Sequence, residues 1–146
     1  MKYNIIFGAD HAGFSLKKHL KNVIQKWGWK AVDCGSYTYN SVDYVDFIKP
    51  VISQVLQNYN SIGVLICGSG IGFSIGANRY RGIKAALCYN KEFAKLAREH
   101  NDANILVLSA RFISEDEAVE CLRIFTTTPF IRGRHLQRIN KIDSIL

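Results

Sequence analysis

The segment from Ile62 to Gly72, with the sequence Ile-Gly-Val-Leu-Ile-Cys-Gly-Ser-Gly-Ile-Gly, constrains the fold of this chain more than any other. Its apolar, partly β-branched run from Val64 to Ile66 predicts a strand buried on both faces, which is typical of a parallel sheet. The three glycines at alternate positions then predict an abrupt turn into a helix that begins near Ile71. Cys67 lies at the corner between strand and turn.

The glycine turn also has chemical consequences. Glycines allow successive backbone N–H groups to point into one concavity, and the positive end of the following helix adds to the attraction for an anion. A thiol held there is expected to ionise more readily than a free cysteine, so Cys67 is a candidate base or nucleophile. A buried, inert cysteine beside an ordinary tight turn is the alternative interpretation.

Strand-like and helix-like patterns alternate along the whole chain. The segments between strands carry apolar residues at helical spacing, and Ser114 fits a capping box before the helix that follows the last strand. This alternation predicts an α/β fold, a Rossmann-like three-layer α/β/α sandwich with a five-stranded parallel sheet. We expect residues 1–146 to form one domain with its functional site at the carboxyl ends of the strands. The predicted strands cover residues 4–9, 30–34, 64–66, 83–87 and 105–108.

Two predicted helices carry more specific expectations. Pro50 falls inside the second helix, so we expect a kink or a later start there. In the helix predicted for residues 91–100, the spacing of Phe93, Leu96 and Ala97 predicts that these three side chains point inward.

Composition and charge argue against membrane, secreted and nucleic-acid-binding classes of protein. The chain has 48% hydrophobic and 21% charged residues, and its longest apolar runs have the length of strands, so no membrane span or membrane partner is expected. The N-terminal pattern does not predict a secretory signal, and we expect a cytoplasmic protein. The formal charge of +7 is spread over several segments without a nucleic-acid-binding motif, which favours a small anionic ligand over nucleic acid. The remaining cysteines lie in apolar elements and are expected to be reduced thiols of the core: Cys34, Cys88 and Cys121.

Two polar clusters next to strands are candidate site residues. Asp10 and His11 directly follow the first strand, where side chains face the ligand crevice, although Asp also commonly caps a helix. His100, Asn101 and Asp102 lie just before the fifth strand, where the alternative is a histidine that interacts with the C-terminal end of a helix. Neither cluster has the spacing of a short metal-binding signature, so no metal site is predicted.

Further candidates for anion binding are three arginines and a serine. Arg134 and Arg138 stand four residues apart, so on a helix they share one face and are able to grip a phosphate together. A solvated basic face is the alternative. Arg111 is placed similarly, just past the fifth strand. The hydroxyl of Ser69 is able either to face an anion or to cap the following helix.

Nucleotide-binding motifs do not fit the glycine turns. Phe14 and Ser15 follow Gly13 where a Walker motif requires Lys and then Ser or Thr. The alternating glycines after Cys67 lack the dinucleotide spacing, and Cys67 itself occupies a glycine position of the nucleophile elbow. A nucleoside triphosphate, a dinucleotide and serine hydrolysis are therefore not expected.

Taken together, these motifs resemble the type B ribose-5-phosphate isomerase family, which also contains isomerases of six-carbon sugar phosphates. The chain departs from the family pattern at Val45, where a proline often follows Asp-Tyr, and at Ser69, where many members have threonine. The resemblance covers essentially the whole chain and rests on blocks at residues 7–14, 43–44, 66–72, 77–78, 100–104, 109–111 and 133–138.

The resemblance implies an aldose–ketose isomerase of the pentose phosphate pathway. Such an enzyme interconverts D-ribose 5-phosphate and D-ribulose 5-phosphate through a cis-enediolate and uses no cofactor. Cys67 would then be the base that moves a proton between C2 and C1, and His100 would help to open the sugar ring. The other implied contacts to substrate are Asp10 and Asn101 to hydroxyl groups, His11, Arg111, Arg134 and Arg138 to the phosphate, and the turn Gly68, Ser69, Gly70, Ile71 and Gly72 to the enediolate.

The resemblance further implies a homodimer, or a tetramer, in which a neighbouring chain completes each site. The chemistry agrees with the glycine turn, because isomerisation removes a weakly acidic proton beside a carbonyl and fixed amide donors stabilise the resulting oxyanion. Two alternatives remain: an isomerase of allose 6-phosphate or galactose 6-phosphate, and a non-catalytic phosphosugar-binding module. The loop from Gly35 to Asp43 is expected to set the length of the sugar that fits.

Overall fold

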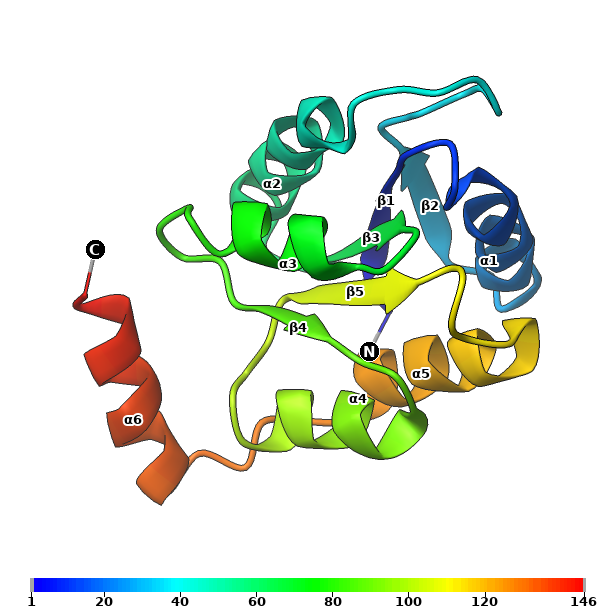
Figure 1. Cartoon of the computed structure of the whole chain (residues 1–146). Coiled ribbons are helices and arrows are strands. Elements are labelled where there is room, and N and C mark those ends of the chain that lie inside the picture. The colour runs from blue at the N-terminus through cyan, green and yellow to red at the C-terminus, as the bar shows by residue number, and fades with distance from the viewer. Residues whose placement is uncertain (1, 146) are drawn as a thin grey trace.

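All five strands of the sheet run parallel, in the spatial order β2-β1-β3-β5-β4. The computed structural model describes residues 2–145, and Figure 1 shows the sheet between two layers of helices. The predicted three-layer α/β/α sandwich is therefore confirmed. The strands are β1 (Asn4–Ala9), β2 (Lys30–Asp33), β3 (Ser61–Cys67), β4 (Ala85–Leu87) and β5 (Ile105–Ser109).

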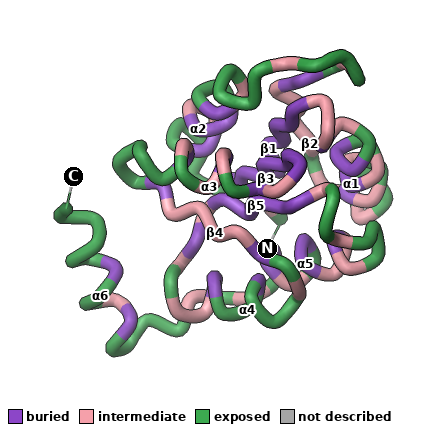
Figure 2. The backbone as a smooth tube through the Cα atoms, viewed as in Figure 1, coloured by how far each residue is buried: buried purple, intermediate pink, exposed green. Residues whose placement is uncertain are grey.

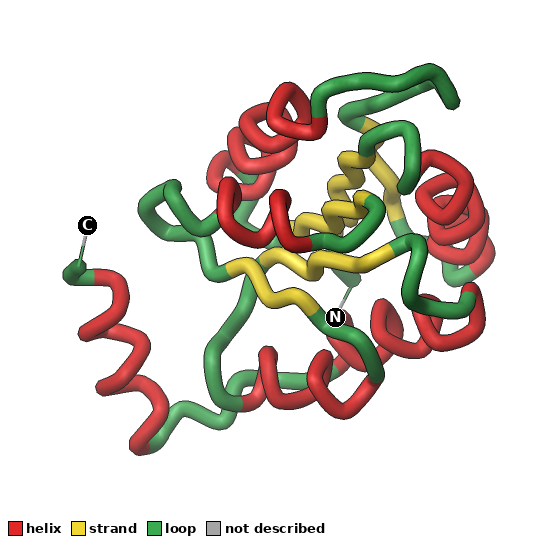
Figure 3. Tube along the Cα trace, in the orientation of Figure 1, coloured by secondary structure: helices red, strands yellow, loops and turns green. Residues whose placement is uncertain are grey.

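Helices cover both faces of this sheet (Figure 3). Alternate residues of β1 show the division, since Ile5 and Phe7 pack with α1, α4 and α5 while Ile6 packs with α2 and α3. All seven residues of β3 are buried, so the run from Val64 to Ile66 does form a strand buried on both faces, and the strand is longer than that run (Figure 2). The helices are α1 (Phe14–Lys26), the 3₁₀ helix η1 (Tyr44–Phe47), α2 (Ile48–Gln57), α3 (Ile71–Ala77), α4 (Lys91–Glu99), α5 (Glu115–Thr127) and α6 (Arg134–Asp143).

The late start expected near Pro50 is confirmed. A 3₁₀ turn occupies residues 44–47, and the α-helix begins at Ile48, which places Pro50 in its first turn. Backbone N–H groups of a first turn have no partner within the helix, so the missing N–H of proline costs little there.

The expected orientation of α4 is partly wrong. Ala97 is buried, but Phe93 is 54% exposed and Leu96 is 44% exposed. The helix instead turns the small side chains of Ala94 and Ala97 toward the core that it shares with α5, which allows the two helices to approach closely. Among the cysteines expected in the core, Cys88 and Cys121 are buried, whereas Cys34 is half-buried.

The C-terminal helix α6 stands away from the sheet at the edge formed by β4 (Figures 1 and 2). Its buried residues are His135 and Ile139. The segment that leads to it is held beside the end of α4, where the Ile131 N–H donates to the Glu99 carbonyl at 3.0 Å. Within residues 2–145 no helix is both long enough and apolar enough to cross a membrane.

Candidate active site

The crevice at the carboxyl ends of β1 and β3 is where the topology favours a ligand. The strand order reverses between these two strands, and the helices that follow them, α1 and α3, lie on opposite faces of the sheet. Such a switch point leaves a gap above the strand ends. Ala9 pairs with Ile66, so the next residues, Asp10 and Cys67, emerge side by side.

Cys67 ends β3 and has 5% of its surface exposed. Its Sγ accepts a hydrogen bond from the Gly70 N–H at 3.1 Å, and Gly70 adopts a φ of 80° that favours glycine. Burial raises the pKa of the Cys67 thiol, while the backbone N–H groups of Gly70, Phe73 and Ser69 lower it and the Asp10 carboxylate raises it. The net direction is upward. The expectation of an easily ionised thiol is therefore wrong, because desolvation outweighs the amide donors.

Asp10 and His11 directly follow β1, beside the end of β3 that carries Cys67. Asp10 is 8% exposed, and its Oδ1 accepts hydrogen bonds from the N–H groups of Ala12 and Gly13, both at 3.0 Å. It therefore caps the turn into α1 as well as facing Cys67. The His11 Nδ1 accepts from the Val42 N–H at 3.1 Å, which assigns the proton of the neutral ring to Nε2. The protonated Nε2 is left as a donor for a ligand.

Two larger side chains lie against the glycine turn. A Cβ at Gly68 would come within 3.1 Å of the Arg111 guanidinium, and one at Gly72 would come within 2.5 Å of the Tyr44 ring. Arg111 thus brings a cation to the turn itself, whereas the resemblance assigns Arg111 to the phosphate. Tyr44 is a site residue that the sequence prediction missed, although it lies within one of the blocks that carry the resemblance. The Ser69 hydroxyl accepts a hydrogen bond from the Ile71 N–H at 3.2 Å. Of the two roles expected for Ser69, this contact corresponds to capping the following helix rather than facing an anion.

The other predicted residues form a second cluster. His100 caps the C-terminal end of α4 and stacks on His135 of α6, a residue to which the sequence prediction gave no role. Burial, His100 and the guanidinium groups of Arg134 and Arg138 lower the pKa of His135. The expected histidine at a helix end and the expected arginine pair therefore belong to one basic group.

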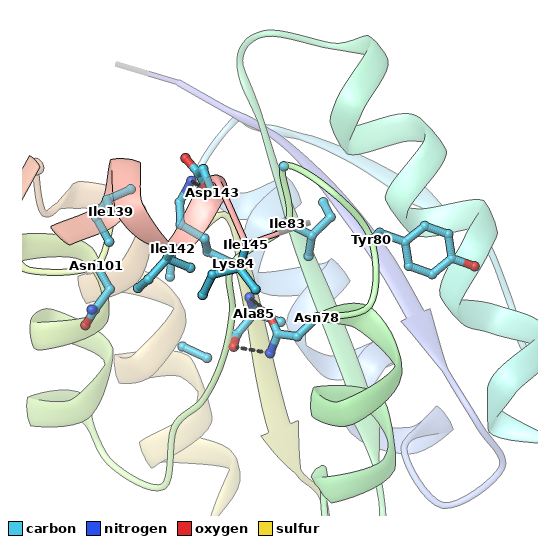
Figure 4. A pocket seen from close by; sticks show the side chains of 13 residues that line it. Asn78, Tyr80, Ile83, Lys84, Ala85, Asn101, Ile139, Ile142, Asp143 and Ile145 are labelled. Carbon is cyan, nitrogen blue, oxygen red and sulfur yellow. Dashed lines mark hydrogen bonds and ion pairs between the residues drawn. The ribbon is translucent and has the colours of Figure 1, made fainter. Parts of the chain in front are cut away.

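Asn101 adjoins this group and lines a cavity of about 460 Å³ between α6 and the edge strand β4. Figure 4 shows Ile139 and Ile142 of α6 on one side of this cavity and Ala85 on the other, where the Asn78 side chain bonds the Ala85 backbone.

Within one chain, the two clusters lie at opposite ends of the sheet. Cys67 is level with Ser109 at the carboxyl end of β5, whereas His100 and Asn101 precede Ile105 at its amino end. The four residue steps of β5 alone span about 13 Å. One chain therefore brings together Asp10, His11, Arg111 and the turn from Cys67 to Gly72, but not His100, Asn101, Arg134 and Arg138.

The comparisons with known proteins assign the family. The model of the ribose/galactose isomerase family matches residues 5–142. This chain belongs to the ribose/galactose isomerase family. As the resemblance implied, it is a sugar-phosphate isomerase. Within residues 2–145 no three His, Cys, Asp or Glu side chains are grouped as metal ligands would be.

Individual relatives agree over the full length. A ribose 5-phosphate isomerase from Thermotoga maritima has 47% identity and a TM-score of 0.96, over 99% of this chain and 100% of that one. The enzyme from Mycoplasma genitalium, solved with bound ribulose 5-phosphate, has 37% identity and a TM-score of 0.94, over 99% and 96%. The ribose-5-phosphate isomerase B of Escherichia coli is 34% identical over 97% of this chain and 95% of its own.

Proposed function

We propose that this protein interconverts D-ribose 5-phosphate and D-ribulose 5-phosphate. The observation that carries the proposal is the position of the Cys67 thiol at the β1–β3 switch point. Its Sγ accepts a hydrogen bond from the Gly70 N–H, and Asp10 lies beside it. The family and the ribulose 5-phosphate complex of the Mycoplasma genitalium relative support the same substrate.

In this mechanism the Cys67 thiolate removes the proton from C2 of the open-chain aldose and returns it to C1. Negative charge develops on the oxygen at C1 in the intermediate cis-enediolate, and O1 gains the proton that O2 loses as the ketose forms. The amides of Gly68 to Gly72 are the donors for that charge, and loss of one such donor typically costs about a hundredfold in rate. The raised pKa of the Cys67 thiol makes its thiolate the stronger base once it forms.

The phosphate would be held far from the reacting carbons. Within the same chain His11 offers its Nε2–H. The guanidinium of Arg111 lies against Gly68, so it is placed nearer to the enediolate than to a remote phosphate. Arg134 and Arg138 supply two further cations on one face of α6. Remote phosphate binding orients C1 and C2 against the base, which is how binding energy lowers the barrier of the chemical step.

The separation of the two clusters supports a homodimer with shared sites. His100, which we assign to ring opening, and Asn101, which we assign to a hydroxyl group, would come from the partner subunit together with its two α6 arginines. Unpaired apolar surface supports this assembly. Ile71 and Ile75 of α3 are 53% and 57% exposed beside the Cys67 turn, and Ile142 of α6 is 48% exposed beside its cavity. In a two-fold symmetric dimer, the patch on α6 of one subunit would face the patch on α3 of its partner, and the same contact would form a second time.

Turnover of three substrates by the wild type, Cys67→Ala and Cys67→Ser tests the proposal. We expect the wild type to prefer ribose 5-phosphate over allose 6-phosphate and galactose 6-phosphate. Both variants should lose about a thousandfold or more in kcat while calorimetric binding of ribose 5-phosphate stays within about threefold. An active Cys67→Ala variant would exclude Cys67 as the base, and a wild type that binds all three sugars without turnover would indicate a binding module.

A further inference from the structure

Lys17 is a fully buried lysine outside the machinery described above. Its side chain is 0% exposed, and its Nζ donates to Asp33 Oδ1 at 2.8 Å and to the Ser36 carbonyl. The Asp33 carboxylate also accepts from Lys21 Nζ at 2.6 Å and from the Gly35 N–H at 2.9 Å. Two lysines and one carboxylate are thus gathered where β2 ends and the loop of residues 35–43 begins.

This arrangement is not explained by stability alone. Removing an ammonium group from water is costly, and burial lowers the pKa of Lys17 although hydrogen bonding to Asp33 raises it. An apolar side chain of similar volume often stabilises a protein as well as a buried ion pair does. A buried ion pair does, however, fix the geometry of the groups that it bonds, and here those groups are the first residues of a loop.

The loop reaches from Lys17 to the substrate crevice. At its start, Ser36 N–H donates to the Ala9 carbonyl at 2.6 Å, one residue before Asp10. In its middle, the Tyr39 ring meets the Phe14 ring edge to face with centroids 4.5 Å apart. At its end, the Val42 N–H donates to His11 Nδ1. The position of the loop therefore decides whether His11 keeps its proton on Nε2.

We propose that Lys17 is a positioning residue for the substrate site. Its ammonium group, bonded to Asp33 and Ser36, holds the loop of residues 35–43 in the arrangement that bonds His11 Nδ1 and presents Nε2–H to the phosphate. The inference rests on the proposed function, because that function makes His11 a phosphate ligand. Lys17 touches no substrate, so its effect is expected in substrate binding rather than in the proton transfer at Cys67.

The test compares Lys17→Met with Lys26→Met, an exposed lysine of the same helix. Protein labelled with ¹⁵N-histidine reports the tautomer of each of its four histidines, and a His11→Asn sample assigns the His11 signals. In the wild type we expect one His11 form, protonated on Nε2. In Lys17→Met we expect tautomer averaging and a KM for ribose 5-phosphate raised about tenfold, with kcat changed less than about threefold. Lys26→Met should match the wild type.

A folded Lys17→Met variant with unchanged His11 signals and an unchanged KM would overturn the proposal, as would an equal loss of kcat and kcat/KM. Should Lys17→Met fail to fold, Asp33→Asn keeps a hydrogen-bond acceptor for Lys17 but removes the charge, and the same readouts apply. A wild type without isomerase activity would refute the proposed function, whereas the histidine spectra would still test whether Lys17 positions His11, because they are independent of turnover.

Discussion

The imidazole rings of His100 and His135 stack with their centroids 4.2 Å apart and their planes inclined by 10°. His100 ends α4 just before Asn101, and His135 lies in the first turn of α6, so the stack joins the end of α4 to the helix that carries the arginine pair. Few other side chains of α6 are buried. The placement of this basic group therefore depends on two rings that pack best while they are not both charged.

The stack makes stability depend on pH. Because burial and neighbouring cations lower the pKa of His135 from 6.5, the unfolded chain takes up a proton there at a higher pH than the folded chain. The stabilisation is then complete above the unfolded value and falls as the pH drops below about 6.5. Urea unfolding of the wild type and His135→Gln between about pH 5 and pH 8 measures it. The stability difference should shrink at low pH, and a constant or growing difference would contradict the shifted pKa.

Without added substrate, the Cys67 thiol is expected to be unreactive at neutral pH. Burial raises its pKa above the ordinary 9.0, so little thiolate is present. Labelling by iodoacetamide at about pH 7.5 should be roughly tenfold slower than for a cysteine peptide and should accelerate as the pH rises past 9.0. Ribose 5-phosphate should protect the thiol. The Cys67→Ser variant identifies the labelled site, and rapid labelling at neutral pH would show that the amide donors outweigh desolvation.

Gly70 and Gly28 form a matched pair for the glycine turn. Their φ values are 80° and 75°, so alanine meets the same backbone strain of about 1–2 kcal/mol at either position. A Cβ at Gly70 would also come within 2.5 Å of Leu87 Cδ1, whereas the nearest atom at Gly28 is 3.6 Å away. We expect Gly70→Ala to destabilise the protein by about 1–3 kcal/mol more than Gly28→Ala in urea unfolding. Equal losses would mean that Leu87 moves aside freely.

Much of the fold was predictable because local patterns specify it. The apolar run of β3 and the capping box at Ser114 predict elements that the structure contains, and Ser114 does accept from the Glu117 N–H at 3.1 Å. The orientation of α4 was not predictable in the same way. Phe93 and Leu96 follow the inward spacing, but the close approach of α4 and α5 selects the alanines for the core, and that contact is tertiary.

The same distinction between local patterns and tertiary contacts applies to the candidate site. Residues next to strand ends, such as Asp10 and Cys67, were placed correctly because parallel topology brings strand ends together. Tyr44 was missed, since only the packing of η1 against Gly72 brings its ring to the turn. The direction of the Cys67 pKa was wrong, because the amide donors are visible in the glycine pattern while the extent of desolvation depends on the assembled core.

Shared active sites can be tested by mixing two inactive variants, Cys67→Ala and His100→Asn. If each site takes Cys67 from one chain and His100 from its partner, a mixed dimer has one site with both substitutions and one site with neither. Random reassociation of equal amounts makes half of the dimers mixed, so about a quarter of wild-type activity should return.

Each variant unfolded and refolded alone supplies the control and should stay inactive. If both residues of a site instead came from one chain, every site in the mixture would lack one of them, and mixing would restore nothing. The separation of Cys67 and His100 along β5 predicts the first outcome. Recovered activity should also fall on dilution below the dimer dissociation constant, because a monomer holds only one half of each site.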